Sequence, residues 1–287
     1  MIINEVCGGN ENSAPKNTGT KNQCTPKPVI ESILAKETFS FADLATMKTR
    51  AAWDAALAAK NIAPIYKVEE IAANNTEAKK YEGRFKDVTL KEAIKGVNYS
   101  HLLSDCSHAT LKSYEGSEYT RIFRVCEDGT VHCEVMDDGS IMGEPLSSYN
   151  VGELIESTDD KPQNAEIQLK FKEYSKSTIE LDFDIIDYEG IYDVTLTVAA
   201  ATATSIKVSA TAGCNNTSVT SFEDGDFVVK DGAGAVQSVT FVPFDTAEGV
   251  YELTGIGFAT GFTVELNDVV AQSTIMYEGV APVAITV

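Results

Sequence analysis

Six cysteines and three histidines are the residues of this chain best suited to binding a metal or acting as a nucleophile. Five of them form a central group: Cys106, His108, Cys126, His132 and Cys133. Zinc fingers and ribbons use closely spaced cysteine pairs, and no Cys-x-x-Cys pair occurs in the sequence. His132 and Cys133 are adjacent, so on a strand their side chains would point to opposite faces. The pattern favours small buried side chains over a zinc site, and neither a metal nor a cofactor is predicted.

The remaining residue patterns do not indicate catalysis. No base, orienting group or oxyanion nest can be recognised beside a cysteine, and neither GxGxxG nor GxxxxGK[ST] is present. Asp224-Gly225-Asp226 lacks the other ligands of an EF-hand. Glu180, Asp182 and Asp184 stand two residues apart, so on the predicted strand 179–185 they share one acidic face. We therefore predict a protein that is not an enzyme.

The redox state of the cysteines follows from the compartment. Cys7 and Cys24 could close a loop in an oxidising compartment. The first six residues lack both a basic n-region and an apolar h-region, so Sec-type export is not expected. Reduced thiols are therefore predicted.

The net charge excludes some partners. The 287 residues include 43 Asp and Glu against 23 Lys and Arg, a formal charge of −20. Such a surface repels phosphate backbones and anionic lipid heads, so neither specific nucleic-acid binding nor membrane insertion is predicted. Apolar runs also stay well below the roughly 20 residues that span a bilayer.

Composition divides the chain into three parts. Residues 1–28 are predicted to be a flexible N-terminal arm, because the stretch from Cys7 to Pro28 is rich in Gly, Asn and Pro. The apolar residues Ile2, Ile3 and Val6 at its head suggest that the arm adds a strand to a neighbouring subunit, although a frayed terminus would look the same. Residues 191–287 contain only two basic side chains, which places a domain boundary near Tyr188-Glu189-Gly190.

The middle part, residues 29–189, is predicted to be an antiparallel β domain with one substantial helix near 40–61. Apolar residues recur at helical spacing after Ser40, which with Asp43 resembles a capping box, and Trp53 is the expected core anchor. Residues 119–135 alternate around Asp128-Gly129 and predict a hairpin. A second Asp-Gly, at 138–139, predicts another reversal. Strands are also predicted at 166–172 and 179–185.

The last part, residues 190–287, is predicted to be an immunoglobulin-like β-sandwich. Short alternating segments recur there between clusters of Gly, Asn and Asp, and no helical pattern is found. Only one cysteine, Cys214, and no tryptophan occur in it, so the antibody-type disulfide is absent. The fold class is therefore mainly β, with an α+β first domain followed by a sandwich.

Several short motifs carry a resemblance to a known family. They are Phe41-Ala42-Asp43, Trp53-Asp54-Ala55-Ala56, the stretch 111–116, Phe123-Arg124-Val125 and Asp128-Gly129. The chain resembles structural proteins of tailed phages of Bacteroidota-type hosts, most closely tail-tube-like subunits with a C-terminal immunoglobulin-like domain. It differs from a standard tube subunit in having an early helix where a strand is usual.

The resemblance implies a virion protein made in the host cytoplasm that assembles with itself and with other virion proteins, without an active site. The acidic face of Glu180, Asp182 and Asp184 would suit a lumen through which DNA slides, and the sandwich would make weak host-surface glycan contacts. A capsid decoration or head-fibre-anchoring protein is the alternative within this class. An alternative of another class is a cell-surface adhesin or glycan-binding module, with Tyr251, Phe258 and Phe262 as candidate exposed aromatics.

Overall fold

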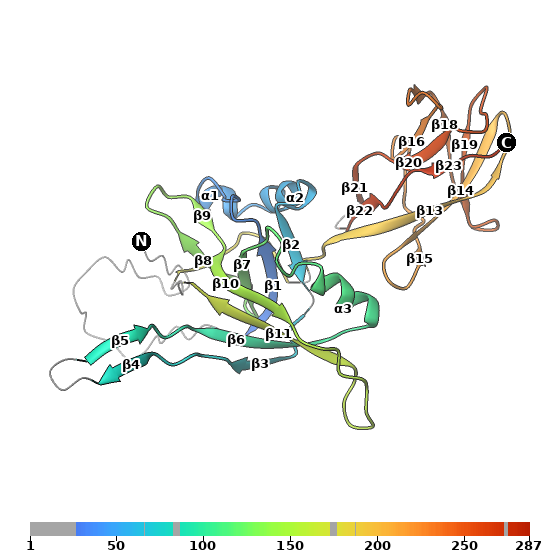
Figure 1. Ribbon diagram of the computed structural model, residues 1–287. Helices are drawn as coiled ribbons and strands as arrows, with labels where there is room; N and C mark the ends of the chain where they lie inside the picture. The colour runs from blue at the N-terminus through green and yellow to red at the C-terminus, as the bar shows by residue number, and fades with distance from the viewer. Residues whose placement is uncertain (1–26, 66, 83–86, 173–176, 187, 273–274) are drawn as a thin grey trace. The chain divides into compact units, whose positions relative to one another are not determined.

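The structure is a computed structural model that describes residues 27–65, 67–82, 87–172, 177–186, 188–272 and 275–287. The chain divides between Tyr188 and Glu189 into two compact units, here called unit 1 and unit 2. Both are built mainly from β-strands (Figure 1), so the predicted mainly β fold class is confirmed. The predicted arm, with Ile2, Ile3 and Val6, lies outside the described residues.

Unit 1 holds the three helices that the described residues form and one large sheet. Its helices are α1 Leu44–Met47, α2 Arg50–Ala58 and α3 Asp105–Lys112. Its strands are β1 Val29–Ala35, β2 Ile62–Ile65, β3 Glu70–Ala73, β4 Lys79–Glu82, β5 Asp87–Lys91, β6 Gly96–Leu102, β7 Arg121–Cys126, β8 Thr130–Val135, β9 Ile141–Met142, β10 Glu144–Val151, β11 Asn164–Phe171 and β12 Ser177–Glu180.

Ten of these strands form one sheet, and β4 and β5 form a separate two-stranded ladder. The main path of the large sheet is β12-β8-β7-β10-β11-β6-β3, with β1 beside β7, β2 beside β1 and β9 beside β8. The predicted hairpin is confirmed as β7 and β8, with Gly129 at φ 78° in the turn. The second Asp-Gly reverses the chain between β8 and β9, with Gly139 at φ 89°. These left-handed conformations are the reason for glycine at both turns.

One apolar core of unit 1 lies where β1, β2 and β7 face β6, β10 and β11. Its buried side chains include Leu34, Ile122, Leu146, Ile167 and Phe171. Strand β11 alternates as predicted, with every second residue buried. Burying apolar area of this extent is the main driving force for folding the unit.

The helix predicted near 40–61 is in fact two shorter helices, α1 and α2. Asp43, not Ser40, is the N-cap of α1: its carboxylate accepts a hydrogen bond from the Thr46 amide at 2.7 Å. The break comes at Thr49, whose backbone is extended and whose hydroxyl donates to the Thr46 carbonyl. A β-branched residue with a hydroxyl competes for backbone hydrogen bonds and so interrupts the helix there. Trp53 is the predicted core anchor, fully buried on α2 with its ring centroid 5.1 Å from that of Phe123.

Helix α3 was not predicted, so the expectation of one substantial helix is wrong. Its signals are nevertheless in the sequence: Ser104 caps its first turn by accepting a hydrogen bond from Ser107, Asp105 lies in the first turn and Lys112 in the last. Opposite charges at the two ends complement the helix dipole. Leu111 is its one buried residue, so this short segment shows no apolar helical period.

Unit 2 contains two sheets that pack around one core. Its strands are β13 Ile191–Ala201, β14 Ser205–Ala212, β15 Thr217–Ser218, β16 Phe227–Lys230, β17 Val236–Gln237, β18 Thr240–Asp245, β19 Val250–Thr254, β20 Thr263–Leu266, β21 Val269–Gln272, β22 Ile275–Gly279 and β23 Val283–Ala284. One sheet follows the order β18-β19-β14-β13-β22-β21, with β15 beside β14, and the other the order β17-β16-β20-β23. Side chains of both sheets share one apolar cluster, as in a β-sandwich.

Candidate assembly surface

The outermost strands of the large sheet in unit 1 differ sharply in exposure. Strands β2, β9 and β12 consist mostly of buried residues. All four residues of β3 are exposed, and the Ile71 side chain, which points to the core side of the sheet, is 45% exposed. A long exposed edge is a template for pairing with another chain, which natural proteins usually block. Among the described residues outside β4 and β5, β3 is the edge left open in this way.

The hydrogen-bond pattern shows which groups of β3 face the open edge. Thr76 and Ile94 exchange both of their amide bonds, and the Asn74 amide donates to the Gly96 carbonyl at 2.9 Å. Because bonding alternates along an antiparallel pair, the backbone groups of Ala72 point toward β6 and those of Ile71 and Ala73 point away from it. The open edge therefore offers the N–H and C=O groups of these two residues.

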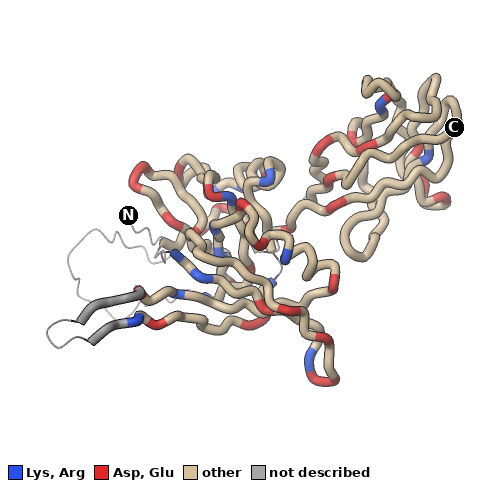
Figure 2. The backbone as a smooth tube through the Cα atoms, viewed as in Figure 1, with Lys and Arg blue, Asp and Glu red and all other residues tan. Residues whose placement is uncertain are grey.

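Beyond β3 the chain continues into a protruding two-stranded ribbon. Strands β4 and β5 pair antiparallel, and a bridge between Thr76 and Ile94 joins them to β3 and β6 (Figure 1). The segment 74–95 carries six basic residues against four acidic ones, although the whole chain has a charge of −20. Acidic residues are spread over both units (Figure 2). This local reversal of charge, visible in the sequence, is the signal that could have identified the ribbon as a contact element.

A polar network holds the base of the ribbon against the sheet. The Lys170 side chain crosses β6 at Gly96 and donates to the Asn74 side-chain oxygen at 2.8 Å and to the Asn74 carbonyl. Asn74 in turn donates to Asn98 at 2.6 Å, and Asn98 donates to Glu166 at 3.1 Å. A Cβ at position 96 would lie 2.4 Å from the Asn74 carbonyl oxygen, so only glycine leaves room for the crossing. The network fixes the direction in which the ribbon leaves the sheet.

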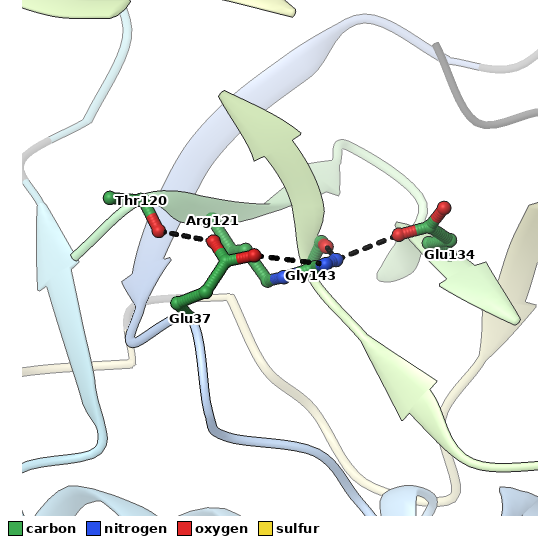
Figure 3. Close-up of polar contacts among 5 residues, drawn as sticks. All are labelled: Glu37, Thr120, Arg121, Glu134 and Gly143. Atoms are coloured by element: carbon green, nitrogen blue, oxygen red, sulfur yellow. Dashed lines mark hydrogen bonds and ion pairs between the residues drawn. The ribbon is translucent and has the colours of Figure 1, made fainter. Parts of the chain in front are cut away.

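A network of charged side chains centred on buried Arg121 joins strands in another part of the sheet. Arg121 of β7 donates to Glu134 at 2.7 Å and to the Gly143 carbonyl at 2.9 Å, and it also pairs with Glu37 (Figure 3). A hydrogen bond from Thr120, together with Arg121, lowers the pKa of the Glu37 carboxyl. The network thereby joins the segment after β1 to β7, β8 and the start of β10.

A second buried pair lies deeper in unit 1. Glu144 accepts from Arg124 at 2.5 Å and 2.9 Å, and the Arg124 guanidinium lies 5.1 Å from the centre of the Phe171 ring. Opposite Arg124 on β8, His132 contacts the Thr178 hydroxyl at 3.3 Å. Burial lowers the pKa of His132 to about 4, so the imidazole is neutral at pH 7. These groups hold β7, β8, β10 and β12 together.

The predicted acidic face differs from what the structure contains. Glu180, Asp182 and Asp184 are all exposed, but β12 ends at Glu180 and the next residues leave the sheet. The Asp182 amide bonds to the Lys48 carbonyl, and the Asp184 carboxylate accepts from the Ile186 amide at 2.9 Å. The prediction that one strand presents all three is therefore wrong, because these contacts replace ladder bonds after residue 180.

The cysteines and histidines considered for zinc do not converge. His108 bonds to the Gly152 carbonyl and His132 contacts Thr178, while Cys126 and Cys133 are buried thiols whose pKa burial raises. No group of three or more metal-ligating side chains is found within the described part of the chain. Cys106 is disulfide-bonded.

Cys214 is disulfide-bonded as well, so the prediction of reduced thiols is wrong for two of the four cysteines that the structure describes. The sequence could not indicate this, because disulfide formation depends on two Cα atoms coming within bonding reach in the fold. Cys7 and Cys24 lie outside the described residues.

The aromatics considered for glycan binding belong to the core of unit 2. Tyr251 and Phe258 are buried, and Phe262 is half-buried against the same cluster. The Tyr251 hydroxyl donates to the Val219 carbonyl at 2.8 Å and accepts from the Phe222 amide, and burial raises its pKa to about 12. In the Asp224-Gly225-Asp226 stretch, the Asp226 carboxylate accepts hydrogen bonds from the Glu223 amide and the Gln272 side chain. The expectation that these three aromatics form an exposed platform is not met.

A scan against protein-family models finds no match to this chain, and a search of curated proteins finds no similar sequence. Among the described residues, no helix is both long and apolar enough to cross a membrane. The resemblance to phage tail proteins therefore stays a prediction.

Proposed function

We propose that this chain is a non-enzymatic structural subunit of a tailed-phage virion, tail-tube-like in its role, that assembles with copies of itself and with other virion proteins. The observation that carries the proposal is the open edge of β3, with four exposed residues and the ribbon that continues from it. An exposed edge without a protecting proline is a liability in a monomer and a contact in an assembly.

The two units suit different roles in this proposal. In unit 2, the edge strands β17 and β23 have two residues each, and the edge strand β18 contains Pro243 and a break in register. Short edges and edge prolines discourage pairing with other chains. Unit 1 would therefore make the assembly contacts, and unit 2 would serve as an immunoglobulin-like appendage that makes weak contacts with host-surface glycans.

Charge supports the same proposal. A ribbon with a positive balance on a strongly acidic chain favours contact between the ribbon of one copy and the acidic surface of another. The acidic surface would also repel DNA, so a passage built from it would let DNA move without binding. Association by such contacts weakens as salt is added.

The test is the mass of the full chain in solution, measured by analytical ultracentrifugation and viewed by negative-stain electron microscopy. Replacing Lys79 and Lys91, which are paired in the register of β4 and β5, by glutamate reverses their charge and should reduce the higher-order species. Replacing Lys207 and Lys230 of unit 2 by glutamate changes the net charge by the same amount and should leave the higher-order species in place. A chain without residues 1–26, with β1 intact, tests the arm in the same assay.

The outcome that would refute the proposal is a full chain that stays monomeric at millimolar concentration and low salt. If particles form, their symmetry and copy number in the virion separate a tail subunit from a capsid decoration protein.

A further inference from the structure

Strand β3 raises the question of which strand completes it. We infer that its outer edge pairs with the same edge of a second copy of this chain, antiparallel, across a two-fold axis at Ala72. This inference rests on the proposed self-assembly and specifies one of its contacts.

Self-pairing follows from the other edges. A head-to-tail contact needs a second open edge to receive β3, whereas a two-fold contact uses the same edge twice. Outside the ribbon, the remaining outermost strands of unit 1 that the structure describes are mostly buried. Four of the five outermost strands of unit 2 have only two residues or contain proline, and the fifth, β21, has a single exposed residue. The edge best suited to β3 is therefore β3 itself.

The backbone fixes the register of this pair. Of the four β3 residues, only Ile71 and Ala73 turn their N–H and C=O groups outward, so we place these two at the hydrogen-bonded positions. Placing Ile71 opposite Ala73 of the second copy uses all eight outward groups of the two strands and forms four hydrogen bonds. Placing Ile71 opposite itself would require the Glu69 backbone, whose amide already donates to the Ser100 carbonyl at 2.8 Å. Placing Ala73 opposite itself would require the backbone of Asn75, which lies outside β3.

The side chains fit this register. Ala72 falls opposite Ala72 of the second copy at a non-hydrogen-bonded position, where strands bring side chains closest and a small residue is needed. Glu70 falls opposite Asn74 and not opposite another carboxylate. Ile71 lies beside Ala73 on the core side of the joined sheet, which covers its exposed side chain. In this register the backbone groups pair, small side chains meet at the closest position, and no two carboxylates face each other.

Single cysteines in the full chain test the register. Under mild oxidation, Ala72→Cys should form a covalent dimer about tenfold faster than Ile71→Cys or Ala73→Cys, because only position 72 meets itself at disulfide distance. Wild type reports the background from the native cysteines, and Ala72→Ser controls for the substitution. The readout is the dimer band on a non-reducing gel, lost on reduction.

A second pair of variants tests the edge without a disulfide. Ala73→Pro removes an outward N–H that β6 does not use, and it should raise the dissociation constant of the pair at least about tenfold. Ala73→Ser keeps the N–H and should bind as wild type does. Unchanged Trp53 fluorescence in both variants shows that unit 1 remains folded.

Each result decides the inference. Fastest crosslinking at position 71 or 73 overturns the register, and crosslinking at the wild-type rate in all three variants overturns pairing through β3. If that second result comes with assemblies in the ultracentrifuge, the inference fails and the proposed function stands. If every sample is monomeric, both fail.

Discussion

Replacing Glu144 by glutamine should strongly destabilise unit 1. The Glu144 side chain is fully buried and accepts two hydrogen bonds from Arg124, whose side chain is only 4% exposed. Glutamine keeps the volume but removes the negative charge that Glu144 presents to the Arg124 guanidinium. Removing one partner of a buried ion pair costs about 3–5 kcal/mol. With an m-value of about 2 kcal/mol/M, the urea midpoint of unit 1 should fall by roughly 2 M.

Fluorescence of Trp53 makes this measurement specific to unit 1. It is the only tryptophan, it is fully buried, and its indole N–H donates to the Met47 carbonyl at 2.7 Å. The matched control is Glu134→Gln, because Glu134 pairs with Arg121 on the same sheet but is 24% exposed. A partly solvated pair contributes about 1 kcal/mol or less, so this midpoint should move little.

A double variant separates charge from packing. Arg124→Met with Glu144→Leu replaces the pair by apolar side chains, which is often neutral for stability. We expect it to be more stable than Glu144→Gln alone. Equal urea midpoints for Glu144→Gln and Glu134→Gln would contradict this prediction, since burial would then have no effect on how much an ion pair contributes to stability.

Other variants test further parts of unit 1. Gly96→Ala should cost about 1–3 kcal/mol in the Trp53 assay, because the new methyl group collides with the Asn74 carbonyl; an unchanged midpoint would contradict the crossing. Asp43→Ala should cost about 1 kcal/mol by removing the cap of α1, whereas Asp43→Asn should cost less. Because the folded His132 takes up its proton near pH 4 and the unfolded chain near pH 6.5, unit 1 should lose up to about 3 kcal/mol on acidification between these values, and His132→Gln should remove that part of the profile. The buried Cys133 thiol should resist alkylation until urea unfolds the unit; rapid labelling of the native protein, located by peptide mass mapping, would contradict its burial.

Local patterns in the sequence determined much of the β architecture. The Asp-Gly pairs at 128–129 and 138–139 specify tight turns on their own, because glycine reaches positive φ without strain. The alternation in β11 identifies its buried face from period alone. Trp53 could be assigned to the core for the same kind of reason, since a large apolar side chain on a helical stripe must be covered.

Patterns of similar strength failed where tertiary contacts compete with them. From Ile179 to Ile185 every second residue is buried or half-buried, yet the strand ends at Glu180, and the Asp182 amide bonds to the Lys48 carbonyl instead of to a strand. The helix after Asp43 breaks at Thr49 for a local reason, but only the fold shows that the second helix places Trp53 against Phe123.

The candidate site depended on the tertiary structure almost entirely. Segment 74–95 shows its charge reversal in sequence, but exposure of an edge is a property of strand order, and strand order is set by pairing between residues far apart in the chain. Nothing in Glu70-Ile71-Ala72-Ala73 distinguishes an outermost strand from an inner one. The sequence by itself determined that this is an acidic β protein in two parts; the fold decided which strand is left open, because only packing determines which backbone groups remain unpaired.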